Sequence, residues 1–259
     1  MAQRSTSVRK SAHARLLKTA PLPTRRTEAK GLPKNDGREM PWARDGTTIS
    51  TRERILAAAM HHFADVGLAH ASVRAITRLA GVNSALIRYH FGSKKALYVE
   101  VLGLITKRLV EVRIQALQAL RASYGDKPIP LDALLQAYAA PIFPRAQDDL
   151  SKDAAIYLRF FGRIYTEPSD ELRDIVQAHF TDLQNQYIDH IAKAVPHVTR
   201  QTVVVRFGML IGALAFLGAK MGIIGLLSGG KFDEEDSQTT LAHFVVSFVQ
   251  LFNARDLSN

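Results

Sequence analysis

The stretch GVNSALIRYHFGSKKAL, residues 81–97, decides the fold of the N-terminal part of this 259-residue chain. It opens with a glycine turn, continues as a short helix with several hydrogen-bond donors near its end, and finishes with two lysines. Ile87 and Phe91 are four residues apart and share one helix face, which we expect to be buried. The residues left to point outward are Ser84, Ala85, Arg88 and Tyr89, with Leu86 at the margin. A helix that only stabilises a bundle needs no such row, whereas a helix that enters a DNA major groove does.

A longer helix is expected upstream of this stretch. Ser50, followed three residues later by Glu53, forms a capping box for a helix over about residues 51–66. Apolar residues recur at helical spacing within it, and Gly67 supplies the stop.

Two short helices follow the longer one. Ser72 caps the first of them, whose apolar positions fall on one stripe, and Gly81 breaks it because glycine adopts positive φ readily. Asn83 is placed to cap the second. Two short helices joined by a glycine turn, behind a longer supporting helix, form a helix-turn-helix unit.

Residues 48 to 102 resemble the DNA-binding domain of the TetR family of transcriptional repressors. The pattern SVRAITRLAGVNSALIRYHFGSKKALYVEVL, residues 72–102, carries the likeness. Its specific elements are the turn Ala80-Gly81-Val82, the triplet Tyr89-His90-Phe91 and the helix start Ser93-Lys94, at the family's spacing.

The resemblance implies contacts with double-stranded DNA by nine residues. The residues of the recognition helix that approach the groove are Ser84, Ala85, Leu86, Arg88 and Tyr89. The positions that match family contacts to phosphate or a base are Ser72 and Arg74, and those that match contacts to the DNA backbone are Tyr89, His90 and Lys94. Leu86 and Arg88 replace a small residue and a tyrosine that are frequent in the family, so the operator does not transfer. We interpret Arg88 as the residue that reads a base directly, because arginine offers two parallel donors to guanine.

The excess positive charge lies at the N-terminal end. Of a net charge of +10, residues 1–48 contribute 11 Lys and Arg against 4 Asp and Glu, and residues 49–97 contribute 7 against 2. Residues 98–259 are slightly acidic, with 16 against 18. We therefore expect three regions: a disordered basic arm over 1–48, the helix-turn-helix domain over 49–97, and a different functional domain over 98–259. Whether the arm is an inert leader or adds salt-dependent DNA affinity stays open.

The remainder of the chain is expected to be helical, which makes the protein all-α. Turn-forming residues separate the segments, and no alternating strand pattern of useful length appears. The expected helices cover about residues 94–123, 131–145, 153–166, 169–195, 199–227 and 236–253.

The last two long helices are too apolar to face water. Small residues at spacings of three and four let another helix approach closely; they are Gly208, Gly212, Ala215 and Ala219. A monomer could bury these helices internally, but the resemblance implies a homodimer joined by a four-helix interface. The longest apolar run, residues 207–219, is shorter than the roughly 20 residues of a membrane span, so we expect no membrane insertion.

Aromatic residues in the middle of the chain are the candidates for an effector site. Any one of them is more readily explained as core, but as a group below a DNA-binding domain they favour an apolar cavity. The candidate ligand-binding residues are Tyr138, Tyr157, Phe160, Phe161, Tyr165 and Phe207. Residues 148–176 and 206–222, together with residues 81–97, are similar to a fatty-acid-responsive branch of the family, which implies a long-chain fatty acid or acyl-CoA as effector.

Other classes of function fit less well. The chain has no cysteine, which favours the reducing cytoplasm, and residues 1–48 contain no apolar signal segment. It lacks the common nucleophile, zinc-protease, phosphate-loop and dinucleotide motifs, so we predict no catalytic residue, metal or cofactor and no enzyme. A nonspecific architectural DNA-binding protein is the alternative; it would explain the basic arm but not the aromatic C-terminal part.

Overall fold

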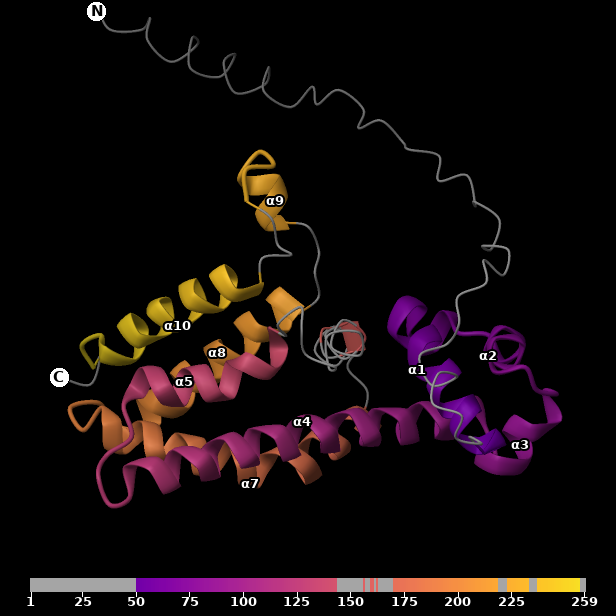
Figure 1. The fold of residues 1–259 in the computed structure, drawn as a ribbon, viewed down its shortest axis with the longest axis horizontal. Helices are drawn as coiled ribbons and strands as arrows, with labels where there is room; N and C mark the ends of the chain where they lie inside the picture. Colours follow the sequence, from indigo (N-terminus) through magenta and orange to yellow (C-terminus); the bar gives the residue numbers. More distant parts are fainter. Residues whose placement is uncertain are drawn as a thin grey trace, which may run out of the picture. The chain divides into compact units, whose positions relative to one another are not determined.

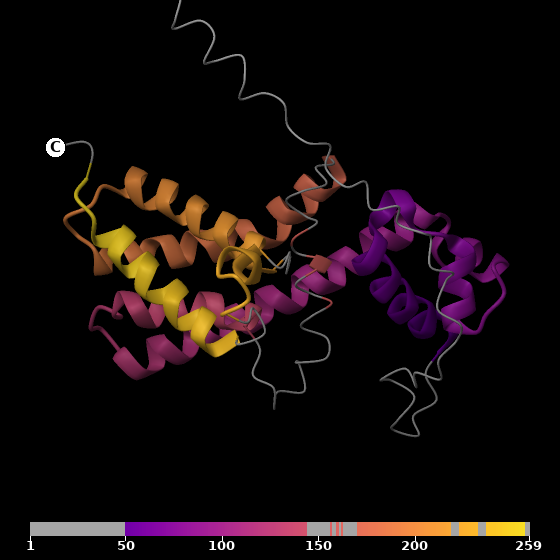
Figure 2. The same ribbon diagram turned by 90° about the horizontal axis from the view of Figure 1, so that it is seen from above.

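The computed structural model describes residues 50–143, 156, 159–160, 162, 170–218, 223–232 and 237–256. Every element in these ranges is a helix (Figures 1 and 2), which confirms the all-α prediction. The chain divides into two units, Met1–Thr48 and Ile49–Asn259, and the helices belong to the second. The basic arm predicted over 1–48 lies outside the described residues.

The first helix, α1, covers Thr51–His70 and starts as the sequence indicates. The Ser50 hydroxyl accepts a hydrogen bond from the Glu53 N–H, and the Glu53 carboxylate accepts one from the Ser50 N–H at 2.9 Å. Gly67, the predicted stop, does interrupt the helix, because its φ of 73° and ψ of 173° are not helical. Helical bonding resumes after it, so α1 is kinked at Gly67 and continues to His70.

The turn between α2 (Val73–Ala80) and α3 (Ala85–Phe91) is held by a side chain from α1. Gly81 has φ 63°, the left-handed conformation that ends a helix. The Arg54 guanidinium donates to the carbonyl of Ala80 at 2.6 and 3.0 Å and to that of Gly81 at 2.7 Å. Arg54 therefore satisfies the carbonyls that the end of α2 leaves without helical partners.

The long helix α4, Lys94–Tyr124, joins the helix-turn-helix unit to the rest of the chain. Its first turn is capped by the Ser93 hydroxyl, which accepts from the Ala96 N–H at 3.0 Å. Near its start α4 packs on α1 and α3, and further along it packs on α5 and α7. With 31 residues it extends about 46 Å. The boundary expected after residue 97 falls inside this helix, and the division into domains there stays a prediction.

The remaining helices form the bundle beyond α4. They are α5 (Leu131–Ala139), the 3-10 turn η2 (Ala140–Ile142), α7 (Asp170–Ala194), α8 (Arg200–Gly218), α9 (Ile223–Leu227) and α10 (Ser237–Asn253). The helix predicted over 131–145 ends early, since Pro141 has no N–H for helical bonding. Within the helix predicted over 199–227 the structure describes α8 and α9, and residues 219–222 lie outside the described residues. Most of the helix predicted over 153–166 lies outside the described residues.

Two buried charged residues fasten α8 to α10. From α8, Arg206 donates to the carbonyls of Phe252 at 2.9 Å and Arg255 at 3.1 Å, at the end of α10. In return, the Asp256 carboxylate accepts from the Thr199 N–H at 2.7 Å and the Thr202 hydroxyl at 2.9 Å, at the start of α8. Each helix thus caps the other, and neither can shift along its axis without losing hydrogen bonds.

We expect Arg54→Ala to lower the free energy of unfolding by about 2 kcal/mol, because charge-assisted hydrogen bonds to the end of α2 are lost. Arg78→Ala is the matched control, since this arginine on α2 is exposed and its loss should cost no more than about 0.5 kcal/mol. Urea unfolding followed by circular dichroism measures both. Equal effects of the two substitutions would show that the Arg54 contacts do not hold the turn.

Candidate DNA interface and effector region

The short helix α3 presents the face that its sequence predicts. Ile87 and Phe91 are buried, which anchors the helix on the core of the unit, and Leu86 is half-buried at the margin. The exposed residues are Ser84, Ala85, Arg88 and Tyr89. Asn83 provides the expected capping contact, since its side-chain oxygen accepts from the Ala85 N–H at 2.9 Å.

The residues expected at the DNA backbone differ in their exposure and in the hydrogen bonds that they make within the protein. Tyr89 is exposed, and its ring meets that of the half-buried His90 edge-on, with 5.0 Å between the centroids. The Lys94 ammonium is half-buried and donates to the carbonyls of Leu68 and Ala71, both at 2.9 Å. Lys94 therefore holds the end of α1, a structural role that the sequence pattern did not reveal. Two of its three N–H donors are engaged in this way.

The start of α2 is tied to α1 by a histidine that sequence reasoning did not select. The Ser72 hydroxyl accepts from the Ala75 N–H at 3.4 Å, and the Ser72 N–H donates to His62 Nε2 at 3.2 Å. Burial lowers the pKa of His62, as do the positive charges of Arg78 and Lys94, against the opposing charge of Asp65. The neutral imidazole is the form that can accept this bond.

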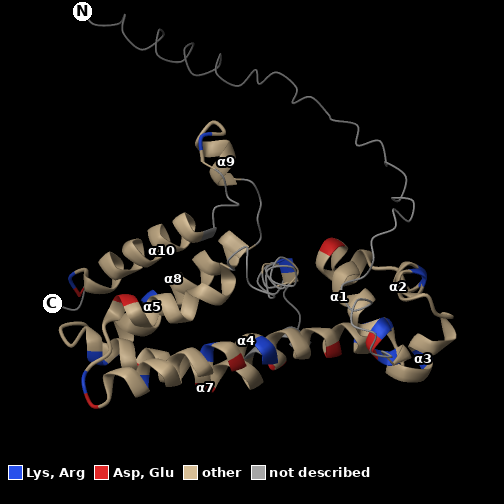
Figure 3. Ribbon diagram, in the orientation of Figure 1, with Lys and Arg blue, Asp and Glu red and all other residues tan. Residues whose placement is uncertain are grey.

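Basic residues dominate the surface of this unit. Figure 3 shows Lys and Arg on α2, α3 and the start of α4. Arg74, at the start of α2, and Arg88, on α3, are both exposed. Exposed Arg78 and Lys95 join them and were not among the predicted contacts. The two acidic residues of 49–97, Glu53 and Asp65, are both on α1, so the only charged residues that α2 and α3 carry apart from His90 are arginines.

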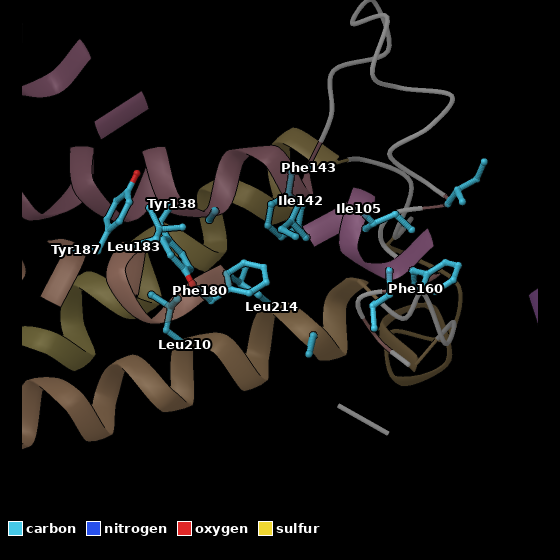
Figure 4. Close-up of a cluster of buried hydrophobic side chains, with 14 of the residues drawn as sticks. Ile105, Tyr138, Ile142, Phe143, Phe160, Phe180, Leu183, Tyr187, Leu210 and Leu214 are labelled. Carbon is cyan, nitrogen blue, oxygen red and sulfur yellow. The ribbon is translucent and has the colours of Figure 1, made fainter. Parts of the chain in front are cut away.

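The candidate effector residues separate into two places. Tyr138 is buried with Phe207, whose ring centroid lies 5.0 Å away, and with Tyr187 at 4.9 Å. Phe160 is buried apart from Tyr138 (Figure 4). Its ring stacks on that of Tyr98, with 5.6 Å between the centroids. The other three candidates, Tyr157, Phe161 and Tyr165, lie outside the described residues.

A buried arginine accompanies Tyr138 and was missed from the sequence. The guanidinium of Arg113, on α4, lies 3.8 Å from the centroid of the Tyr138 ring, and its Nε donates to the Tyr138 carbonyl at 2.8 Å. The Tyr187 hydroxyl donates to the Arg113 carbonyl at 3.0 Å. Burial raises the pKa of Tyr138, and the positive charge of Arg113 opposes that rise. In the sequence, the position of Arg113 four residues before Leu117, on the apolar stripe of α4, was the signal that this arginine is buried.

A kinked supporting helix, a glycine turn and an exposed basic second helix, continued by a helical bundle, define a helix-turn-helix DNA-binding protein. The family model described as "Bacterial regulatory proteins, tetR family" matches residues 55–101. A second family model, described as "Tetracyclin repressor-like, C-terminal domain", matches residues 136–249. The chain belongs to the TetR family of transcriptional regulators; it is a DNA-binding regulator and not an enzyme.

Individual relatives agree with this assignment. The chain is 25% identical over 187 residues to the HTH-type transcriptional regulator BetI of Stenotrophomonas maltophilia, covering 72% of this chain and 87% of that protein. A transcriptional regulator from Rhodococcus sp. Rha1 shares the fold with a TM-score of 0.55 and 19% identity, over 79% of this chain and 99% of that one. The fatty acid degradation regulator FadR from Bacillus halodurans does so with a TM-score of 0.52 and 16% identity, over 80% and 97%.

The bond between Ser72 and His62 predicts a pH dependence. Because the folded state lowers the pKa of His62 below its ordinary 6.5, the unfolded chain binds more protons as the pH falls through that value. The stability that neutral His62 contributes is therefore full above pH 6.5 and is lost below it. The amide oxygen of glutamine can accept the same hydrogen bond without titrating. We therefore expect His62→Gln to lose less stability between pH 7.5 and pH 5 than the unaltered protein does.

Thermal unfolding of the unaltered protein and of His62→Gln at several pH values measures the difference in stability. His190 also has its pKa lowered by burial, but it is present in both proteins and cancels in the comparison. Identical pH profiles for the two proteins would contradict the role of His62.

Proposed function

We propose that the protein is a dimeric repressor that acts in the cytoplasm, binds a palindromic operator through α3 of each subunit, and is released by a small apolar effector. The observation that carries the proposal is the exposed row on α3, built over buried Ile87 and Phe91 and surrounded by basic helices. An exposed helix of this kind in a positive surface fits the major groove.

The proposed contact residues divide by chemistry into base readers and backbone contacts. Arg88 offers two parallel donors to guanine, and the apolar Leu86 suits a thymine methyl group. Ser84 and Ala85 are small enough to let α3 approach the base edges. The proposed phosphate contacts are Ser72, Arg74, Tyr89, His90 and Lys94.

The exposed apolar face of α8 supports dimer formation. We call this face the α8 stripe; it consists of Val204, Val205, Gly208, Met209, Gly212 and Phe216, all exposed. A Cβ atom at Gly208 or Gly212 would meet nothing within 4 Å, so both positions are open to a second helix. On α10, Val246 is exposed as well. By length and composition alone α8 could also cross a membrane, but a partner subunit accounts for the same apolar face.

The effector proposal rests on the aromatic cluster of the bundle. Tyr138, Tyr187 and Phe207 form an apolar region beside α4, the helix that leads to the DNA-binding unit. We infer that a long-chain fatty acid or its coenzyme A thioester is the effector class, as the sequence resemblance implies. The Bacillus halodurans protein that shares the fold is a fatty acid degradation regulator. Such an effector releases DNA only as far as it binds the DNA-free state more tightly.

Selection of bound sequences from a random double-stranded DNA pool tests the operator proposal. The unaltered protein should enrich a palindrome, and Arg88→Ala should lose preference at one position of each half-site, by about 1–3 kcal/mol. Arg74→Ala is the matched control, and it should weaken binding to all sequences alike. It should also reduce the slope of log K against log salt concentration by about 1, the value for one phosphate contact. An Arg88→Ala profile identical to that of the unaltered protein would refute base reading by Arg88. Enrichment of no sequence would favour the architectural alternative.

Thermal unfolding with oleate, oleoyl-CoA and butyrate tests the effector class. A ligand that binds the folded state stabilises it by about 2.7 kcal/mol at 100 times its Kd, so one of the two long-chain compounds should raise the Tm. Butyrate should not, because it has too little apolar surface to bury. The same compound should release a selected operator in a gel-shift titration. No change of Tm with oleate or oleoyl-CoA would rule out this effector class.

A further inference from the structure

The segment that follows α8 exposes an unusual amount of apolar surface. We call residues 223–232, which comprise α9 and the turn after it, the α9 arm. Leu226, Leu227 and Phe232 are 79%, 82% and 63% exposed. Large apolar side chains so fully exposed in one short segment mark an interaction surface.

The α9 arm is held in shape by its own hydrogen bonds. Gly230 N–H donates to the Gly225 carbonyl at 2.8 Å and Gly229 N–H to the Leu226 carbonyl at 3.2 Å, the paired bonds of a Schellman motif. Gly229 has φ 62°, the left-handed conformation that the motif requires at this position, and Gly230 also has a positive φ, 78°. The Ser228 hydroxyl accepts from the Phe232 N–H at 3.1 Å. The apolar side chains are therefore presented by a closed turn, which lowers the entropy that docking would cost.

The α9 arm continues the α8 stripe along the chain. The stripe is exposed as far as Phe216, two residues before α8 ends, and the arm begins five residues after that end. A second subunit that covers the stripe up to Phe216 would lie beside the end of α8 that leads to the arm. Of the candidate occupants of this surface, a second copy of the chain is the one that the continuity with the stripe favours.

We propose that the α9 arm of each subunit docks on apolar surface of the partner subunit. The inference rests on the proposed dimer and adds a contact that the α8 and α10 interface does not contain. Two-fold symmetry makes the contact reciprocal, so each dimer has it twice. Every change in the arm therefore acts twice on the dimer dissociation constant.

Sedimentation equilibrium of the full-length chain measures the contribution of the arm. The variant Leu226→Ser/Leu227→Ser/Phe232→Ser should raise the dimer dissociation constant by at least about 100-fold, because six apolar side chains per dimer are lost. Leu79→Ser, at an exposed apolar position on α2, is the matched control and should change it less than about twofold. Met209→Arg, in the α8 stripe, should give monomers. Circular dichroism melting of each variant monitors folding.

Cross-linking identifies what the α9 arm touches. Because the chain has no cysteine, Leu227→Cys provides a single thiol for a benzophenone maleimide. Illumination should join two chains, as seen by mass on a denaturing gel. The same label at Ser123→Cys, an exposed position in the last turn of α4, should give no joined chains.

The outcomes separate this inference from the proposed dimer. One outcome is that the unaltered chain dimerises, Met209→Arg abolishes the dimer, and the arm variant dimerises as tightly as the unaltered protein. That outcome refutes the arm contact but supports the dimer. Cross-links confined to one chain refute the arm contact, as does a label that reacts only with added lipid vesicles. A chain that stays monomeric at 100 μM refutes both proposals.

Discussion

The hydrogen bonds from the Arg54 guanidinium to the carbonyls of Ala80 and Gly81 are the contacts on which the placement of α3, the proposed recognition helix, depends. They fix the turn in which α2 stops and the chain swings into α3, and a Cβ at Gly81 would already approach Arg54 at 3.2 Å. The orientation of α3 follows from that turn and from the burial of Ile87 and Phe91. Base recognition requires placement to a fraction of an ångström, because hydrogen bonds tolerate little error in distance or angle.

The helix-turn-helix unit is joined to the bundle by more than the continuous helix α4. The Tyr98 ring lies between Phe63 of α1, at 5.1 Å, and Phe160 of the bundle, at 5.6 Å. Arg159 pairs with Asp65 at 2.6 Å next to this stack, although both side chains are largely exposed and the pair contributes little on its own. Since closely packed rings do not compress, a displacement of Phe160 has to be accommodated by Tyr98 and then by α1.

Local rules predicted the DNA-binding unit well and the bundle less well. The capping box at Ser50, the positive φ of Gly81 and the buried pair on α3 depend on residues near one another in sequence, and each is confirmed. The roles of Arg54, Lys94 and Arg113 depend on backbone carbonyls 23 to 27 residues away, which no local pattern contains. The candidate effector residues illustrate the same limit, since Tyr138 and Phe160 have similar sequence signals but different neighbours.

In the proposed dimer, rigid placement of the two copies of α3 would turn a small movement into a large loss of affinity. Half-sites of a palindrome on one face of B-DNA are about 34 Å apart, so both copies of α3 would have to match a spacing that the DNA fixes. The reciprocal caps of Arg206 and Asp256 keep α8 and α10 in register, and α4 is the helix that packs both on α1 and α3 and on α5 and α7. A rotation at one end of a helix about 46 Å long is magnified at the other. Because each lost bidentate contact costs about 1–3 kcal/mol and the two subunits of the proposed dimer would lose them together, a modest shift would be enough for release.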